Sequence, residues 1–200
     1  MHAWPRKGKM VLAWGAVGFC MALPILLATQ STLLAWRDPI YIAAGLAGIV
    51  GMALLVLQPL LAIGGLPPLS VLQGRRAHRW IGFLLVLSVI GHVLGLWITS
   101  PPDVLDALLF RSPTPFAVWG VIAMWALFAT ALLALIRRRL RPRTWRLCHG
   151  LLAAVIVGGT IIHAVRIEGT MEPFSKIGLS FVLVVVTGLA LSRLKIRWSR

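Results

Sequence analysis

Long apolar stretches alternate with short polar or basic segments along the chain. Each stretch approaches the ~20 residues that an α-helix needs to cross a bilayer. The predicted spans are residues 10–29, 40–63, 80–98, 116–136, 147–165 and 177–191. The first is longer than the ~7–15 apolar residues of a signal peptide, which predicts a retained span. The pattern predicts an all-α integral membrane protein, a six-transmembrane-helix bundle, forming a single domain over residues 1–200.

The composition supports this fold class. The chain is 59% hydrophobic and 12% charged, whereas soluble proteins average about 25% charged residues. The spans use nearly the whole length, so a second soluble domain has no room. Between the third and fourth spans, residues 105–110 are expected to form a short interfacial helix.

The charges predict the orientation in the membrane. Six spans place sixteen lysines and arginines on one side of the membrane, and only Arg37, Arg111, Arg166 and Lys176 on the other, together with all five acidic residues. By the positive-inside rule, both termini are cytoplasmic. We expect a multi-pass protein of the cell (inner) membrane. The net charge of +15 therefore reflects cytoplasmic loops, and no nucleic-acid partner is expected.

Four of the five histidines form two equal intervals. His78 and His92 are fourteen positions apart, and so are His149 and His163. At ~100° per residue, fourteen positions turn a helix by about 1400°, roughly 40° short of four full turns. Both side chains of each helix therefore project from nearly one face, about 21 Å apart along the axis. Each helix can contribute one ligand to each of two sites.

The third and fifth spans run in the same direction, so His78 should face His149 near the cytoplasmic surface and His92 should face His163 nearer the outside. No carboxylate lies within a span to complete a metal site. Two histidines per level suit a b-type haem, which supplies its own four equatorial nitrogens and takes two axial imidazoles. His78, His92, His149 and His163 are thus the predicted haem-iron ligands, and two haems are expected.

Each histidine also has a plainer interpretation. His78 and His149 lie beside arginines and could be ordinary interfacial residues. His92 and His163 lie deeper, where polar side chains are costly and rare, and the repeated interval makes chance less plausible still. His2 belongs to neither interval and is expected to be a solvated terminal residue.

Several basic residues are weaker candidates for haem binding. Charge-assisted bonds to inner-haem propionates are predicted for Arg75, Arg76, Arg79 and Arg146, and to outer-haem propionates for Arg166. Membrane topology alone also explains the cytoplasmic arginines, and Arg166 could be an exposed loop charge balanced by Glu168. No catalytic residue is predicted, because no serine or cysteine triad can be assembled.

Two further features concern the span edges and helix packing. Trp80 and Trp97 flank the third span, where an aromatic belt is expected. Gly158 and Gly159 allow either a close helix approach or room for a flat ligand.

The stretches RRAHRWIG…GHV (Arg75–Val93) and WRLCHG…IIHAV (Trp145–Val165) resemble the ferric reductase-like transmembrane domain. This domain is the haem-bearing core of NADPH oxidases, ferric reductases and the membrane subunit of the bacterial methionine sulfoxide reductase system. The resemblance implies that His78 and His149 bind the inner haem and that His92 and His163 bind the outer haem. Larger members continue into a flavin- and nicotinamide-binding domain, whereas this chain ends after the sixth span.

The predicted function is therefore an oxidoreductase component, a di-haem cytochrome b that carries electrons from a cytoplasmic-side donor to an external acceptor. The expected donor is a separate flavoprotein or a quinol, so flavin or quinone would be held by a partner or at the cytoplasmic side. The acceptor could be ferric iron, oxygen or a periplasmic reductase subunit. Alternatives are a quinol-linked cytochrome b subunit of a larger complex and a haem-free transport or assembly protein.

Overall fold

The computed structural model describes residues 6–196, in which helices joined by loops are the regular secondary structure and no strand occurs. The long helices are α1 (Arg6–Thr29), α2 (Pro39–Ala62), α3 (Val71–Thr99), α5 (Ala117–Leu135), α6 (Pro142–Arg166) and α7 (Pro173–Ile196). Two 3₁₀ turns, η1 (Thr32–Leu34) and η2 (Arg137–Arg139), and the short helix α4 (Pro101–Leu108) lie between them. Six helices are long and apolar enough to cross a membrane, so the predicted fold class is confirmed.

The helix boundaries differ from the predicted spans mainly at their starts. Helix α3 begins nine residues before its predicted span, and α6 begins five residues before its span. The basic residues that bound the apolar stretches are thus part of the helices. Helix α4 begins at Pro101 rather than at residue 105, because a proline in the first turn sacrifices no helical hydrogen bond.

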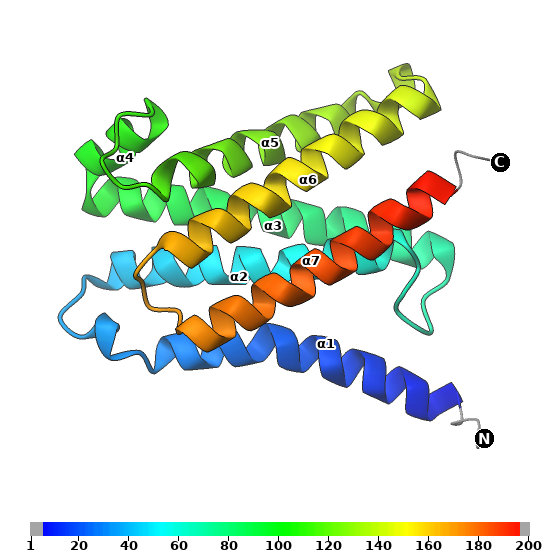
Figure 1. Ribbon diagram of the computed structural model, residues 1–200, viewed down its shortest axis with the longest axis horizontal. Coiled ribbons are helices and arrows are strands. Elements are labelled where there is room, and N and C mark those ends of the chain that lie inside the picture. Colours follow the sequence, from blue (N-terminus) through cyan, green and yellow to red (C-terminus); the bar gives the residue numbers. More distant parts are fainter. Residues whose placement is uncertain (1–5, 197–200) are drawn as a thin grey trace.

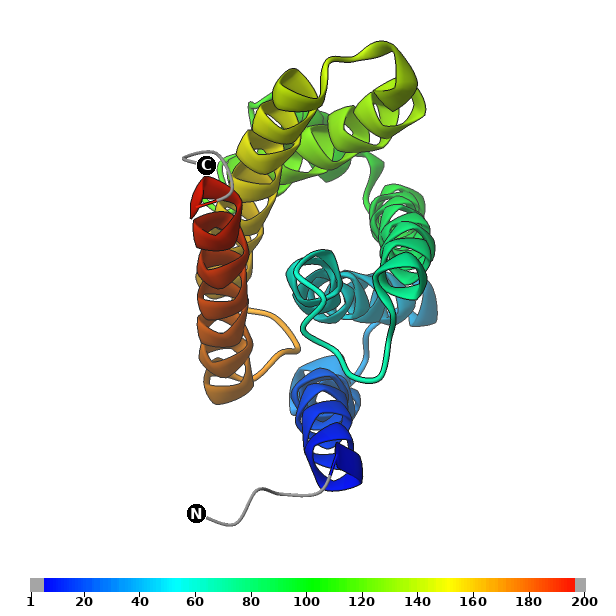
Figure 2. The same cartoon turned by 90° about the vertical axis from the view of Figure 1, so that its right-hand side faces the viewer.

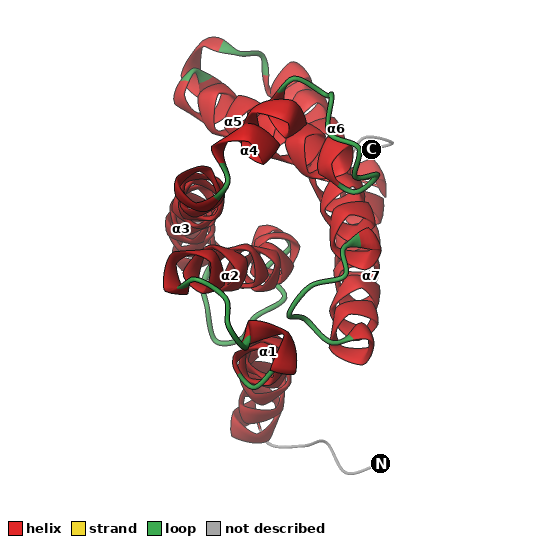
Figure 3. Ribbon diagram, turned by 90° about the vertical axis from the view of Figure 1, so that its left-hand side faces the viewer, coloured by secondary structure: helices red, strands yellow, loops and turns green. Residues whose placement is uncertain are grey.

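The long helices run alternately up and down the bundle. Helix α1 begins and α7 ends at the same end of the molecule, while α4 lies at the opposite end (Figure 1). Seen along the bundle, α2 and α3 form one pair, α5 and α6 form a second, and α7 runs beside α6 (Figures 2 and 3). The odd-numbered and even-numbered spans therefore have opposite directions, so α3 and α6, the third and fifth spans, are parallel.

Side-chain caps define where α2 and α3 begin. The carboxylate of Asp38 accepts hydrogen bonds from the backbone N–H groups of Ile40 and Tyr41 at the start of α2. Ser70 and Gln73 form a capping box at the start of α3, each side chain bonding the other residue's backbone N–H. These bonds satisfy N–H groups that have no partner within the helix.

Each helix pair is closely packed at a glycine. A Cβ atom at Gly95 would lie 2.7 Å from the Ala44 Cβ, where α3 crosses α2. A Cβ atom at Gly159 would lie 2.9 Å from the Trp119 carbonyl oxygen, where α6 meets α5. Small residues allow membrane helices to approach this closely. By contrast, a Cβ at Gly158 would meet nothing within 4 Å.

The core lies where the long helices meet at mid-bundle. It contains Val56 of α2, Leu85 of α3, Leu127 of α5, Ile156 of α6 and Leu183 of α7. Large apolar side chains also cover the outer surface, such as Phe181, which is 68% exposed. Such an apolar surface is stable in contact with lipid. A helix also suits the bilayer interior, because it pairs its backbone N–H and C=O groups internally. The protein is a multi-pass membrane protein.

Candidate cofactor site between two helix pairs

The four spaced histidines meet as two pairs between α3 and α6. The ring centroids of His78 and His149 are 6.1 Å apart, with an interplanar angle of 64°. Those of His92 and His163 are 6.4 Å apart, with an angle of 80°. One pair lies in the first third of both helices and the other lies near their C-terminal ends. The partners and the two levels are those that the spacing predicts.

These separations suit two axial ligands of one metal ion. A metal–nitrogen bond is ~2 Å long, and the ring nitrogen lies ~1 Å from the ring centre. Two imidazoles on opposite sides of one metal ion therefore have centroids roughly 6 Å apart. An edge-to-face pair of rings can have the same centroid distance, since such pairs span about 4.5–7 Å. The hydrogen bonds of the rings show which nitrogen each ring leaves free.

Both outer histidines use Nδ1 to bond a backbone carbonyl. His92 Nδ1 lies 2.8 Å from the Ala44 oxygen in α2, and His163 Nδ1 lies 3.0 Å from the Phe116 oxygen at the start of α5. A carbonyl can only accept, so Nδ1 carries the proton and Nε2 of the neutral ring keeps its lone pair. Metal-binding histidines typically have this arrangement, which fixes the ring and raises its basicity.

A glycine four residues after each carbonyl makes room for these bonds. A Cβ at Gly48 would lie 2.9 Å from His92 Nδ1, and a Cβ at Gly120 would lie 2.7 Å from His163 Nδ1. A helical carbonyl points toward the residue four positions later. Any side chain at Gly48 or Gly120 would therefore occupy the space that the imidazole uses to reach the carbonyl. This glycine, four residues after the accepting carbonyl, occurs once in the α2–α3 pair and once in the α5–α6 pair.

The two histidines of the inner pair, His78 and His149, are held by different contacts. His78 Nδ1 bonds the Gln58 carbonyl oxygen at 3.1 Å, and the Gln58 amide nitrogen donates to the His78 carbonyl oxygen at 3.4 Å. His149 Nδ1 is buried and has no hydrogen-bond partner. Its ring instead stacks on Trp145, with centroids 5.0 Å apart and planes 18° apart. Three of the four imidazoles are thus oriented by carbonyls, and the fourth by an indole.

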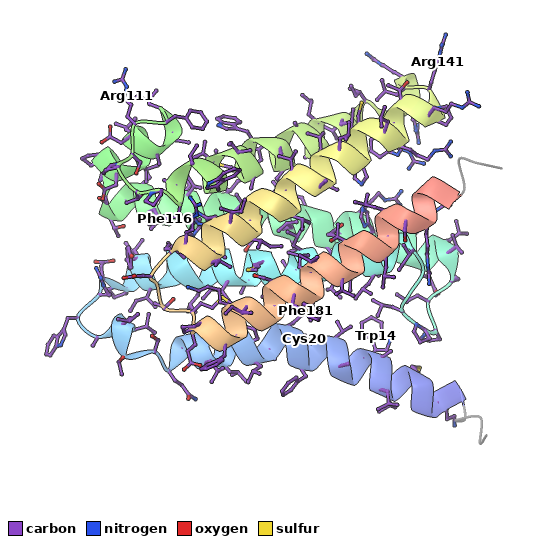
Figure 4. The ribbon with its side chains drawn as sticks, viewed as in Figure 1. Trp14, Cys20, Arg111, Phe116, Arg141 and Phe181 are labelled. Atoms are coloured by element: carbon purple, nitrogen blue, oxygen red, sulfur yellow. The ribbon has the colours of Figure 1, made fainter. Side chains whose placement is uncertain are left out.

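A cavity of about 490 Å³ adjoins the outer pair. Its walls come from α2 to α6 and from the start of α7, and they include His92, His163, Gly48 and Gly120. The volume is within the ~300–1,000 Å³ of small-molecule and cofactor sites. Figure 4 labels Phe116, which lies at this end of the bundle, where its ring also contacts the His163 ring at 5.7 Å. The outer histidines therefore face a space that can hold a cofactor.

The predicted arginine contacts are exposed near the histidines. Arg76 and Arg79 lie on the same helix as His78, Arg146 lies near His149, and Arg166 is at the C-terminal end of α6. Arg75 lines a separate cavity of about 340 Å³ at the end of α2, the start of α3 and the end of α7, and neither inner histidine lines it. Binding of haem propionates by these arginines stays a prediction. His2 lies outside the described residues.

Four residues that shape the site are not marked as site residues by the sequence pattern: Gly48, Gly120, Gln58 and Lys176. A polar Gln58 within an apolar span is the one visible signal, because such residues usually have a partner. Lys176 lines the outer cavity and is only 7% exposed. Across residues 6–196, no three histidine, cysteine or acidic side chains cluster to hold a metal ion.

The family comparison covers most of this region of the chain. Residues 44–160, more than half of the chain, match the model of the ferric reductase like transmembrane component. The match runs from the Ala44 carbonyl on α2 past His78, His92 and His149, and it ends three residues before His163. No curated protein and no solved structure shows significant similarity to the chain. The chain belongs to the family of ferric reductase-like transmembrane components.

Proposed function

We propose that the protein is a di-haem b-type cytochrome that carries single electrons across the membrane. Family membership supports a membrane electron-transfer component of the oxidoreductase type, since ferric reductase-like domains generally bind haem. The finer proposal is that His78 and His149 bind an inner haem and that His92 and His163 bind an outer haem.

The observation that carries the proposal is the repetition of one ligand arrangement at two depths. Two parallel helices each contribute two histidines, and each histidine meets its counterpart at about 6 Å. Three of these rings donate Nδ1–H to a carbonyl, which leaves Nε2 for the metal. Packing alone would not require four polar rings in apolar helices, where polar residues are costly.

Haem, when bound, supplies the one-electron chemistry. The protein holds the imidazoles in fixed orientations through the carbonyls of Gln58, Ala44 and Phe116. The apolar helices exclude water, and the low dielectric around the site influences the reduction potential. Two sites at different depths divide the passage across the membrane into shorter steps.

The charge distribution supports a direction for this transfer. Arg141, in the basic loop between α5 and α6, and Arg111, in the loop after α4, project at opposite ends of the bundle (Figure 4). The end with Arg141 holds most of the basic residues and would lie on the cytoplasmic side of the inner membrane. We infer a donor at that end, a separate flavoprotein or a quinol. The acceptor outside would be ferric iron, oxygen or a periplasmic reductase subunit.

The visible spectrum of the purified protein tests the proposal. After expression with ample haem, detergent-solubilised protein should show a Soret band and a haem-to-chain ratio of about two, as expected for two bis-histidine sites. Absence of a Soret band would refute the cytochrome, and a ratio near one would refute the second haem. These outcomes separate the two parts of the proposal.

Vesicles test the transfer itself. The protein is reconstituted into liposomes that enclose ferricyanide, and dithionite is added outside. Reduction of the enclosed ferricyanide should be faster than in protein-free vesicles and in vesicles with the double variant His92→Ala/His163→Ala. Equal rates in all three preparations would contradict electron transfer across the membrane.

A further inference from the structure

Lys176 is a buried cation in the wall of the outer cavity. It lies in the first turn of α7, its residue is 7% exposed, and it lines the same cavity as His92 and His163. No other lysine or arginine of residues 6–196 lines this cavity. A cation in such a place is costly unless an anion or several hydrogen bonds compensate for its lost hydration.

The protein itself compensates for only part of this cost. The ammonium nitrogen donates one hydrogen bond, 2.7 Å long, to the carbonyl oxygen of Ile167, although an ammonium carries three donors. Asp103, the one carboxylate in the cavity wall, is exposed and accepts a bond from Ser100. The negative charge of Glu168 attracts the Lys176 ammonium, but Glu168 is itself exposed to solvent. Two donors of the buried ammonium therefore remain for a ligand.

The position of Lys176 relates it to the outer histidine pair. Ile167 follows His163 by four residues, and its backbone N–H donates to the His163 carbonyl oxygen at 3.2 Å, where α6 ends. The bond to Ile167, the residue that caps α6, thus places the ammonium just beyond the C-terminal end of this helix, toward the end of the bundle that carries α4. A ligand held between His92 and His163 would need its anionic groups on this side to meet the one basic side chain in the wall.

We propose that Lys176 binds a propionate carboxylate of the outer haem. This inference rests on the proposed function, because it takes the outer cavity to be a haem site. Haem b is a flat apolar ring with two carboxylates, and the cavity offers apolar walls with one buried ammonium. A charge-assisted bond between them satisfies both ions away from water.

Lys176 fits this role better than Arg166 does. Arg166 is exposed at the C-terminal end of α6 and does not line the cavity. A carboxylate bonded to Arg166 would stay hydrated, and exposed ion pairs contribute little. Lys176 also has a purely structural alternative, in which its ammonium only caps a carbonyl at the end of α6, because basic side chains often bond the last carbonyls of a helix.

Haem with blocked carboxylates distinguishes a propionate-binding role of Lys176 from a helix-capping role. The full-length wild type and its variants are stripped of haem and reconstituted with haem b or with its dimethyl ester, which lacks the anionic carboxylates. The variants are Lys176→Met, Lys176→Arg and, as the control, Arg111→Gln in the exposed loop after α4. Occupancy of the outer site is taken from the haem-to-chain ratio relative to His92→Ala.

The wild type should bind haem b at the outer site roughly 10- to 100-fold more tightly than the ester, as expected for a charge-assisted hydrogen bond. Lys176→Met should abolish this preference and lower the midpoint potential of the outer haem, because a nearby cation favours the reduced form. Lys176→Arg should keep part of the preference, and Arg111→Gln should keep all of it.

Two results would overturn the inference while the proposed function stands. One is an unchanged preference for haem b in Lys176→Met. The other is a loss of affinity in Lys176→Met that is equal for haem b and for the ester, which would identify Lys176 as a helix cap only. If the wild type takes up no haem of either kind, the proposed function fails, and the inference fails with it.

Discussion

The imidazole of His149 lies parallel to the indole of Trp145, one helical turn earlier in α6, with ring centroids 5.0 Å apart. The Cζ atom of Arg137 lies 5.5 Å from the centroid of the same indole. His149 is also the only one of the four paired histidines whose Nδ1 has no hydrogen-bond partner. Stacking is therefore the contact that orients this ring, and the inner site depends on it.

Replacing the indole should weaken the inner haem. In Trp145→Leu, the His149 ring loses its stacking partner and becomes free to rotate. Aromatic pairs contribute about 0.5–1.5 kcal/mol beyond their buried area, so haem affinity at the inner site should fall about two- to tenfold. The measurement is the haem-to-chain ratio during stepwise removal of haem, with the inner site identified from a His149→Ala variant.

Trp125→Leu is the matched control, because Trp125 is also a tryptophan of a membrane span but is 54% exposed on the bundle surface. It should leave both haems unchanged. If Trp145→Leu retains the inner haem as firmly as Trp125→Leu does, then stacking does not orient His149.

Removing one outer histidine should empty one site. His92→Ala or His163→Ala leaves a single imidazole at the outer level, so the haem-to-chain ratio should fall from about two to about one. His78 and His149 should still give the spectrum of a bis-histidine haem. His2→Ala, which alters neither interval, should keep both haems, and unchanged spectra in His92→Ala and His163→Ala would refute the outer assignment.

The neighbouring glycines of α6 should affect stability unequally. In Gly159→Ala, the new Cβ would lie 2.9 Å from the Trp119 carbonyl oxygen, so the backbones of α5 and α6 must separate. Overpacking of this kind costs about 1–3 kcal/mol. Gly158→Ala meets nothing within 4 Å and should melt at or slightly above the wild-type temperature, because alanine is the better helix former. Thermal unfolding in detergent measures both, and equal melting temperatures would show that α5 and α6 do not pack through Gly159.

The fold could be predicted from the sequence because its determinants are local. The number of spans follows from the length of each apolar stretch, and the histidine pairs follow from the helix period and from the parallel direction of two spans. The boundaries are predicted less accurately, because Arg146 and Arg75 interrupt the apolar pattern while the helices continue through them.

The surroundings of the histidines could not be predicted in this way. The Ala44 and Phe116 carbonyls are backbone groups, and no residue type marks them as acceptors for a distant ring. Gly48 and Gly120 resemble other glycines of membrane helices until the facing histidine is known. Lys176 was counted only as an external charge, because its burial depends on the loop that joins α6 to α7.

Gly48 and Gly120 should control the cofactor rather than the stability of the fold. A Cβ at either position meets a histidine ring, which can turn away, whereas the Cβ of Gly159→Ala meets the backbone.

Gly48→Ala should break the hydrogen bond from His92 to the Ala44 carbonyl, and Gly120→Ala should break the hydrogen bond from His163 to the Phe116 carbonyl. Outer-haem affinity should fall roughly 10- to 100-fold, as expected when a metal-binding histidine loses the hydrogen-bond partner that orients it, with little change in the melting of the haem-free protein. Gly91→Ala, next to His92 but with open space around it, should keep the wild-type ratio and midpoint potential. A loss of the inner haem, or an equal loss in Gly91→Ala, would contradict the role assigned to the two glycines.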